Sequence, residues 1–429
     1  MEPKLGNFFI FRGKLILDED KTDDKILYFH PKSEDVMIKS RIVGLSEAVI
    51  NFTEDFTDEP CQYLYTTTTC QVFQVVEDNI CFVMTVINDN KKSKCCVGLY
   101  QTILNIAYRT FCFFHGNCSY ILKNNNSDYS CLSKYLECFF DSYLSTLSAS
   151  SFNLLNAEGY MKFFCLEKNN FMRVYCSMNR LSSSFSDIAC TALFFNDEIV
   201  WSGLHHSDMR ILYYYVTKCL LPRSRETTNE AGTPKINQYG KFLHGPSDLS
   251  KDNKPTLPLV HICNGNEVVK SYHLVVYAAL SSTLCMLVNG KTPPNEQWFR
   301  NIHDYLDVQQ SALATDIYEE WISRKQENSS SPTYIYINGA DFSSKRSNKS
   351  IVEPACSLIA DMHYTWKFNE SDYSELIVQH SHSDLWVVKR KDYDKEQFIV
   401  LTDSLNFSQI SDELRNCNYD ENFSLQLWD

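Results

Sequence analysis

Short apolar runs separated by polar turns recur along most of the chain, and segments with helical spacing of apolar residues stand between them. Near the middle, Thr191–Phe195 and Ile199–Trp201 flank Asn196-Asp197-Glu198, a pattern that predicts a β-hairpin with a tight turn. Ser207 follows as a candidate N-cap of a helix. At about 100° per residue, six side chains of this helix share one apolar stripe: Met209, Leu212, Tyr213, Val216, Cys219 and Leu220. This central block therefore predicts two strands with a helix packed on them.

The first part of the chain repeats this order of elements. Two strands, a helix, further strands and two helices are predicted there, in this order: Phe8–Leu17, Lys25–Phe29, Arg41–Phe56, Tyr63–Val76, Ile80–Ile87, Leu99–Phe114 and Cys131–Leu147. Met161–Asn179, just before the central block, is expected to add strands or a short helix.

After the central block, the polar stretch Pro222–Gln238 is predicted to be a surface loop. Strands and then one or two helices follow: Lys241–Leu243, Leu257–Ile262, Ser271–Val288 and Asn295–Arg324. Lys325–Pro332 marks the clearest boundary of the chain. A shorter last segment predicts a strand, a helix, three strands and a helix: Thr333–Asn338, Glu353–Tyr364, Glu375–His380, Leu385–Lys389, Gln397–Leu401 and Phe407–Cys417.

The composition is typical of a globular protein, with 44% hydrophobic and 22% charged residues. The net charge of −13 argues against nucleic-acid binding, because phosphate recognition needs clustered lysine and arginine. The start of the chain has no uninterrupted apolar segment, and Tyr272–Val288 is shorter than the ~20 residues that span a bilayer. The 17 cysteines are scattered without a C-x-x-C pair, which favours buried side chains in a reducing compartment. We therefore expect a soluble, cytoplasmic protein.

Three patterns that could carry chemistry are incomplete. Gly290-Lys291-Thr292 ends like a phosphate-binding loop, but Cys285 stands where that loop requires glycine. His380 and His382 can lie on one face of a strand, without a third metal ligand at a set spacing. His205-His206 precedes the predicted helix and is interpreted as loop or cap. No G-x-S-x-G, H-E-x-x-H or G-x-G-x-x-G motif occurs, so we expect no catalytic residue, metal or cofactor.

The central block, extended to Thr191–Arg223, resembles the second longin domain of the Ccz (calcium–caffeine–zinc sensitivity) vacuolar fusion family. Other segments resemble the same family in the same order and spacing: Lys25–Pro31, Arg41–Phe56, Asn237–Pro246, Tyr272–Val288, Leu313–Trp321, Thr333–Asn338 and Ser383–Leu401. The departures are a short lead before Phe8 and short loops at Asn88–Cys96 and Asp341–Ile351. They concern loops, so they put contacts made by these loops in doubt but not the fold.

The resemblance implies an α/β protein of three longin-type domains, each a mainly antiparallel sheet flanked by helices. We place these domains at residues 1–150, 151–326 and a shorter 327–429. The resemblance also implies a Mon-type longin partner and shared exchange activity toward the late-endosomal Rab GTPase. In animals a third subunit with a β-propeller would join them, and the complex would sit peripherally on late-endosomal and lysosomal membranes.

The helix Arg41–Phe56 is the candidate interaction surface. A narrow sector of this helix is expected to cover the sheet: Ile42, Leu45, Val49, Phe52 and Phe56. Val43 and Ile50 lie about 90° away, so the apolar face is wider than the ~100° that one sheet requires. Either a neighbouring strand or loop covers this pair, or the pair meets the partner. On the second interpretation, we predict a partner and GTPase interface formed by Arg41, Val43, Glu47, Ile50, Asn51, Tyr63 and Tyr65.

Ile211 and Tyr215 fall outside the apolar stripe of the central helix. We predict that they form an interdomain seam, and an exposed interface is the alternative. For the whole chain, two alternatives to a direct exchange role stay open. It could be a scaffold that only stabilises the partner and recruits an adaptor, or a longin adaptor that binds SNARE or coat proteins.

Overall fold

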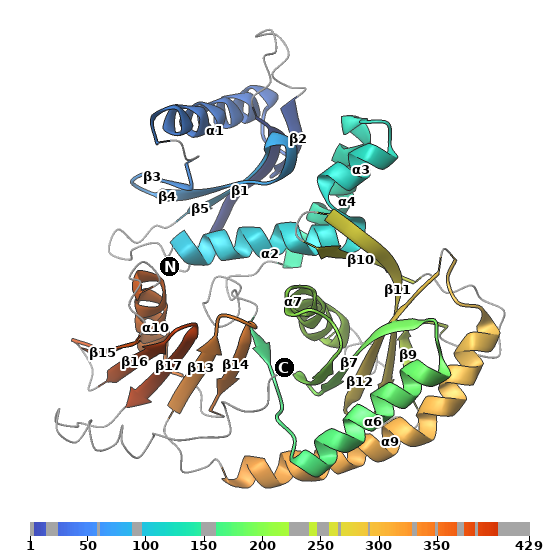
Figure 1. Ribbon diagram of the computed structural model, residues 1–429. Coiled ribbons are helices and arrows are strands. Elements are labelled where there is room, and N and C mark those ends of the chain that lie inside the picture. The colour runs from blue at the N-terminus through green and yellow to red at the C-terminus, as the bar shows by residue number, and fades with distance from the viewer. Residues whose placement is uncertain are drawn as a thin grey trace. The chain divides into compact units, whose positions relative to one another are not determined.

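The computed structural model (Figure 1) describes residues 4–13, 25–57, 61–87, 97–146, 160–222, 240–246, 257–264, 267–290, 292–327, 333–347, 351–366, 373–381 and 385–401. The predicted loop after Pro222 and the predicted last helix Phe407–Cys417 lie outside these residues. Contacts divide the chain into two units. The first contains Met1–Gly159 with Leu259–Ser271, and the second contains Tyr160–Pro258 with Tyr272–Asp429. The predicted domain limits stay predictions.

The first unit is built on a five-stranded antiparallel sheet of order β2-β1-β5-β4-β3. Its strands are β1 Lys4–Arg12, β2 Ile26–His30, β3 Tyr63–Tyr65, β4 Thr69–Val75 and β5 Ile80–Ile87. Its helices are α1 Val36–Thr57, α2 Val97–His115, α3 Cys118–Asn124 and α4 Tyr129–Thr146, and a 3-10 turn, η2 Glu77–Asn79, joins β4 to β5. Helix α1 covers one face of the sheet, and α2 and α4 cover the other (Figure 1).

Two details of the first unit differ from the sequence prediction. The predicted strand Tyr63–Val76 is the hairpin β3–β4, because the chain turns at residues 66–68. Helix α3 was not predicted. The side chain of Asn117 caps it by accepting the Tyr120 N–H at 2.8 Å.

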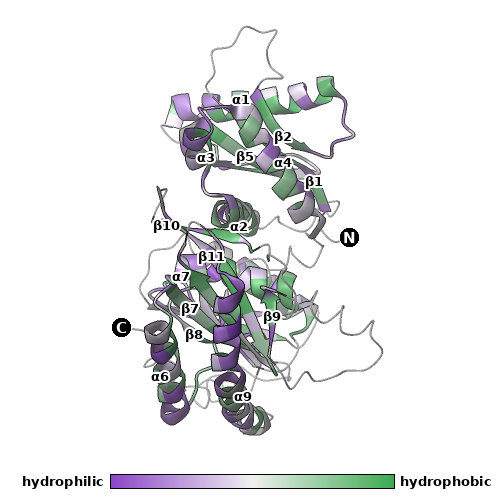
Figure 2. Cartoon of the chain, turned by 90° about the vertical axis from the view of Figure 1, so that its right-hand side faces the viewer, coloured by the Kyte–Doolittle hydropathy of each residue, from purple (hydrophilic) through white to green (hydrophobic). Residues whose placement is uncertain are grey.

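The second sheet has the order β10-β11-β12-β7-β8, and β9 pairs with β11. Its strands are β7 Ile188–Phe195, β8 Glu198–Ser202, β9 Lys241–His244, β10 Leu259–Asn264, β11 Glu267–Ala279 and β12 Ser282–Val288. Its helices are α6 Lys168–Ser184, α7 His206–Tyr214 and α9 Glu296–Glu327. The predicted β7–β8 hairpin is confirmed, and Tyr272–Val288 is the pair of buried strands that the sequence predicted. In Figure 2, α6 and α9 are largely hydrophilic on the side that faces the viewer.

Helix α7 corrects the predicted cap. The cap is His205, whose Nδ1 accepts the Ser207 N–H, so Ser207 lies inside the helix. From Tyr215 to Leu220 the helix continues with π geometry. The wider turn changes the spacing of side chains, and Cys219 and Leu220 are therefore only half-buried, whereas the rest of the predicted stripe is buried.

The third sheet has the order β15-β16-β17-β13-β14-β6. Its strands are β6 Met161–Lys162, β13 Thr333–Asn338, β14 Ser343–Arg346, β15 Tyr373–Gln379, β16 Trp386–Asp392 and β17 Lys395–Leu401, and α10 Glu353–Trp366 packs on it. All pairs are antiparallel except β14–β6. The predicted fold class, α/β with mainly antiparallel sheets flanked by helices, is confirmed.

One short segment joins the second and third sheets within the second unit. The Met161 N–H donates to the Phe342 carbonyl at 2.7 Å, which places β6 beside β14. Three residues on, the Phe164 N–H donates to the Ile199 carbonyl of β8 at 2.9 Å. Because this segment is hydrogen-bonded to both sheets, the two sheets form one unit rather than two. Among the described residues, no helix is long and apolar enough to cross a bilayer.

Candidate functional site on helix α1

In the described part of the chain, no three His, Cys, Asp or Glu side chains are grouped so that they could hold a metal ion. Lys291 and His382, members of two incomplete motifs, lie outside the described residues. His205 caps α7, and His206 lies beside the ring of Phe342 at 6.4 Å between ring centroids. Several exposed apolar side chains of the described residues lie on α1: Val36, Met37, Ile38, Leu45, Phe52 and Phe56. We take the surface of α1 as the candidate site.

The structure reverses the predicted faces of α1. Val43 and Ile50 are buried against Phe9, Phe11 and Phe73 of the sheet, so they cannot form a flank that meets a partner. Ser46 lies between them in the buried stripe, where its hydroxyl donates to the Ile42 carbonyl at 2.9 Å. Because this hydrogen bond satisfies the hydroxyl, a polar residue such as Ser46 can face the sheet.

The opposite face of α1 is apolar and exposed. Leu45 is 62% exposed, Phe52 is 64% exposed and Phe56 is 74% exposed. The rings of Phe52 and Phe56 contact each other at 4.6 Å between centroids. We call this face the outer ridge, and its apolar residues follow one another at alternating intervals of four and three: Ile38, Ile42, Leu45, Val49, Phe52 and Phe56.

This spacing is the heptad pattern of helices that pack along one another with interlocking side chains. Ile42 is half-buried and also packs against the core cluster beneath α1, Val49 is half-buried, and the other four members are exposed. A solvent-facing helix surface of a monomer rarely carries such a continuous apolar line. The outer ridge is therefore the surface of α1 best suited to bind another helix. The heptad spacing is visible in the sequence, from which most of these residues were predicted to cover the sheet.

Charges differ between the two ends of α1. Lys39 and the exposed Arg41 lie in its first turns, and Glu54 and Asp55 lie in its last turns. The Lys39 ammonium donates to the Lys32 carbonyl at 3.0 Å, which keeps the basic end next to β2. Helix α1 thus runs from a basic end to an acidic end.

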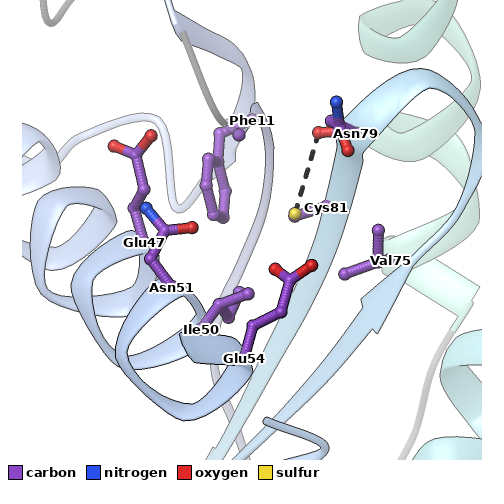
Figure 3. A pocket seen from close by; sticks show the side chains of 9 residues that line it. Phe11, Glu47, Ile50, Asn51, Glu54, Val75, Asn79 and Cys81 are labelled. Atoms are coloured by element: carbon purple, nitrogen blue, oxygen red, sulfur yellow. Dashed lines mark hydrogen bonds between the residues drawn. The ribbon is translucent and has the colours of Figure 1, made fainter. Parts of the chain in front are cut away.

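Three of the predicted interface residues, Glu47, Ile50 and Asn51, line a pocket between α1 and the end of the sheet (Figure 3). The volume of this cavity is about 60 Å³. The other residues that line it are Phe11, Gly13, Glu54, Val75, Asn79 and Cys81. The Glu47 carboxylate forms an ion pair of 3.1 Å with Lys25. The size of the pocket suits a side chain better than a nucleotide.

Tyr63 and Tyr65, the remaining predicted interface residues, lie on the edge strand β3. Both are about half-exposed, and their rings contact each other at 5.4 Å. Leu64 between them packs against the cluster that α1 covers, so the two tyrosines lie on the opposite face of the sheet. The predicted set is therefore divided among the basic end of α1, its pocket flank, the core and the far face of β3.

The interdomain seam predicted for Ile211 and Tyr215 stays a prediction. Ile211 is buried, and the Tyr215 hydroxyl hydrogen-bonds His244 of β9 at 2.7 Å. The contact with the third sheet is made by neighbouring residues. The Arg210 guanidinium lies 4.4 Å from the centre of the Phe342 ring, and the ring of His206 lies on the same residue.

Two family models match the chain. Residues 5–116, which contain α1, β3 and the pocket, match the first longin domain of INTU, CCZ1 and HPS4. Residues 188–307 match Intu longin-like domain 2. Both matches confirm predicted longin domains, and the longin nature of the third sheet stays a prediction.

Three relatives in other organisms are similar over nearly their whole length, and each is called Vacuolar fusion protein CCZ1 homolog. The relative in Nematostella vectensis is 30% identical, and the match covers 98% of both chains. The relative in Xenopus laevis is 28% identical over 96% of this chain and 95% of its own. The relative in Dictyostelium discoideum is 24% identical over 97% of this chain and 96% of its own.

Proposed function

The chain belongs to the CCZ1 family of vacuolar fusion proteins, and on this basis we propose that it is one subunit of a guanine-nucleotide exchange factor. The complex would activate the late-endosomal Rab GTPase and thereby support endosome maturation and fusion with lysosomes or vacuoles. It would act peripherally on these membranes, recruited as a complex. No covalent chemistry is required of this chain.

The outer ridge is the observation that carries the proposal. Its exposed leucine and phenylalanines resemble the apolar centre of a permanent interface, since aromatic residues are enriched there. The heptad spacing fits a helix as the opposing element. A Mon-type longin subunit would supply this helix, and in animals a β-propeller subunit would bind elsewhere on the pair.

Charge at the ends of the ridge favours one direction of pairing. An opposing helix that runs antiparallel and has the same polarity would place its acidic end beside Lys39 and Arg41. Its basic end would then face Asp55 of this chain. The proposal therefore includes antiparallel packing of the two helices.

Exchange would follow from differential binding. A complex that binds the nucleotide-free GTPase more tightly than the nucleotide-bound form must weaken nucleotide affinity by the same factor. It would do so by holding the switch loops of the GTPase in an arrangement that no longer coordinates Mg²⁺ and phosphate. We assign the GTPase contact to the first unit, on surfaces of α1 and β3 that the partner leaves uncovered.

A scaffold or adaptor role is the second candidate, and the same ridge favours it. If a partner helix covers the whole ridge, this chain would stabilise the partner without touching the GTPase. Surface variants distinguish the two candidates. If this chain is a scaffold, a variant loses exchange activity only when the heterodimer dissociates.

The test combines partner binding with nucleotide release. Phe52→Glu and Leu45→Glu place a charge in the ridge without filling or emptying the core, so we expect at least a tenfold loss of co-purified Mon-type subunit. Tyr393→Glu, at a 69% exposed aromatic residue of the second unit, is the matched control and should retain the partner. Release of labelled GDP from the late-endosomal Rab is measured with each heterodimer. Normal partner binding by Phe52→Glu would refute the assignment of the ridge, and absence of release with the wild-type heterodimer would refute the exchange function.

A further inference from the structure

Three cationic side chains of the second unit lie together where the second and third sheets are joined. Lys162 belongs to β6, Arg346 to β14 and Lys218 to the π turn that continues α7. Lys162 pairs with Ser344, and Arg346 follows Ser344 by two residues, so the two cations share one face of the third sheet. Partial burial lowers the pKa of the Lys218 ammonium, and the charges of Lys162 and Arg346 lower it further, so all three are close enough to repel one another. We call these three residues the cationic cluster.

A carboxylate compensates part of this cluster. Asp197, in the turn between β7 and β8, accepts a hydrogen bond from the Lys162 ammonium at 2.7 Å and forms an ion pair with it. Lys218 and Arg346 are exposed, and neither forms an ion pair or a side-chain hydrogen bond in the part of the chain that the structure describes. The cationic cluster therefore keeps two positive charges that have no ion-pair partner.

These two charges match a phosphate monoester. Such a group carries a charge of about −1.5 to −2 at neutral pH and has three strong acceptor oxygens. The guanidinium of Arg346 can donate two parallel hydrogen bonds to it, and the ammonium of Lys218 adds a point charge. A carboxylate, with a single charge, would leave one of the two cations uncompensated.

A phosphate group on another protein fits the cluster better than a bilayer or a small metabolite. Basic segments that bind anionic lipids contain about four to eight lysines and arginines, whereas this cluster has three, one of them already paired. The net charge of −13 also opposes the approach of the chain to a negative surface. Small metabolites bind in concave pockets that bury them, whereas Lys218 and Arg346 are exposed, as in sites that recognise phosphorylated segments of proteins.

We propose that the cationic cluster binds a phosphorylated serine or threonine side chain of a partner protein. In this complex the phosphate bridges Lys218 and Arg346, and the ion pair of Lys162 with Asp197 lies beside it. The π turn contributes, because its wider spacing changes the direction in which Lys218 leaves the helix, and π turns are frequent at functional sites. This binding is separate from exchange, since the cluster belongs to the second unit and the proposed partner and GTPase surfaces belong to the first.

Peptide binding to the full chain tests the cluster. The probe is a fluorescent pool of peptides with phosphoserine at one fixed position and mixed residues around it, and the same pool with serine is the comparison. Fluorescence anisotropy should show at least about tenfold tighter binding of the phosphoserine pool. Lys218→Gln and Arg346→Gln should each lower this affinity about three- to tenfold, because each removes one charge-assisted contact.

Lys168→Gln and Arg180→Gln are the matched controls, because they remove the same two kinds of charge from exposed positions of α6. Their affinities should stay within about twofold of wild type. Thermal unfolding of each variant verifies that the fold is retained.

Asp197→Asn should increase the affinity, an effect that a merely structural role of the cluster would not produce. The substitution retains the shape of the side chain and releases Lys162 from its ion pair. A third cation then faces the phosphate, so the affinity for the phosphoserine pool should rise about three- to fivefold at low ionic strength.

Several outcomes would overturn the proposal. Equal binding of the two pools would mean that the phosphate is not recognised, and unchanged affinity of the double variant Lys218→Gln with Arg346→Gln would place the peptide elsewhere. Inorganic phosphate that binds as tightly as the pool would mean that the cluster holds an adventitious ion only. Vesicles of phosphatidylcholine and phosphatidylserine that bind wild type, but not the double variant, in place of the pool would assign the cluster to a membrane. Nucleotide release by the heterodimer should be the same in wild type and the double variant, so failure of the exchange function is observed separately.

Discussion

At the scale of single residues, Glu396 of the third sheet is buried in contact with two ionisable side chains, His363 of α10 and Lys389 of β16. Glu396 accepts a hydrogen bond from His363 Nδ1 at 2.5 Å and forms an ion pair of 3.2 Å with Lys389. The Lys389 ammonium also donates to the Met362 carbonyl at 3.1 Å. All three are at most 5% exposed. Each charge is therefore compensated by neighbours that the sheet and α10 supply.

Removing one charge from this group should be costly. Lys389→Met removes the ammonium that pairs with the buried Glu396 carboxylate and leaves it with His363 alone, and we expect the free energy of unfolding to fall by about 3–5 kcal/mol. Chemical denaturation measures the loss. The double variant Lys389→Met with Glu396→Gln should recover part of it, since no uncompensated charge remains. A double variant no more stable than Lys389→Met would contradict this account.

Glu396 also predicts a dependence of stability on pH. Burial by itself would raise its pKa, but the hydrogen bond and charge of His363, and then the charge of Lys389, bring the pKa below the ordinary value. Its ionised form therefore stabilises the folded protein above the unfolded pKa of about 4.3, and this contribution disappears as pH falls through the lower folded pKa. Unfolding midpoints measured below about pH 5 should fall less steeply in Glu396→Gln than in wild type. Parallel slopes would exclude this role.

At the scale of elements, helix α6 obtains its cap from another helix. Its N-cap residue Glu167 makes no capping hydrogen bond with its own side chain. Instead, Glu320 of α9 accepts the Glu167 N–H at 2.6 Å and the Asn170 side-chain amide at 2.8 Å. A buried carboxylate at this end of the helix is also favourable to the helix dipole.

Glu320→Ala should therefore destabilise the second unit by about 1–2 kcal/mol, the usual cost of losing an N-cap. Glu319→Ala, at the exposed neighbouring position, is the control and should have little effect. Thermal unfolding followed by circular dichroism compares the two. Equal melting temperatures would show that water replaces Glu320 at no cost.

At the scale of elements, the sequence predicted most helices and strands but not every feature of α1 and α7. The positions of most described strands and of α1, α2, α4, α9 and α10 followed from periodicity, because burial on one side imposes a period on the sequence. Periodicity did not decide which face of α1 is buried, because both faces are apolar and the buried face contains a polar residue, Ser46. Ser207 was predicted as the N-cap because serine is the commoner N-cap residue, whereas the cap is His205, which the sequence had indicated as loop or cap.

At the scale of the whole molecule, the segment Tyr160–Phe164 joins the second and third sheets. Met161→Pro removes the N–H that donates to the Phe342 carbonyl, so β6 can no longer pair with β14. We expect faster hydrogen exchange in both β14 and β8, because the same segment is bonded to each sheet. Met161→Leu, which keeps the N–H and the apolar volume, should leave exchange unchanged. Faster exchange confined to β14 would show that the two sheets are not coupled through this segment.

The sequence by itself determined the family, the mainly antiparallel α/β fold and the order of most elements, because these depend on local periodicity and turn residues. It also contained the heptad spacing of the outer ridge. The tertiary structure alone decided that this ridge is exposed while Val43 and Ile50 are buried, and that Glu47, Asn51 and Glu54 line a pocket. Which of two apolar faces is buried depends on the shape of the sheet beneath, and that shape is made by residues distant in the sequence.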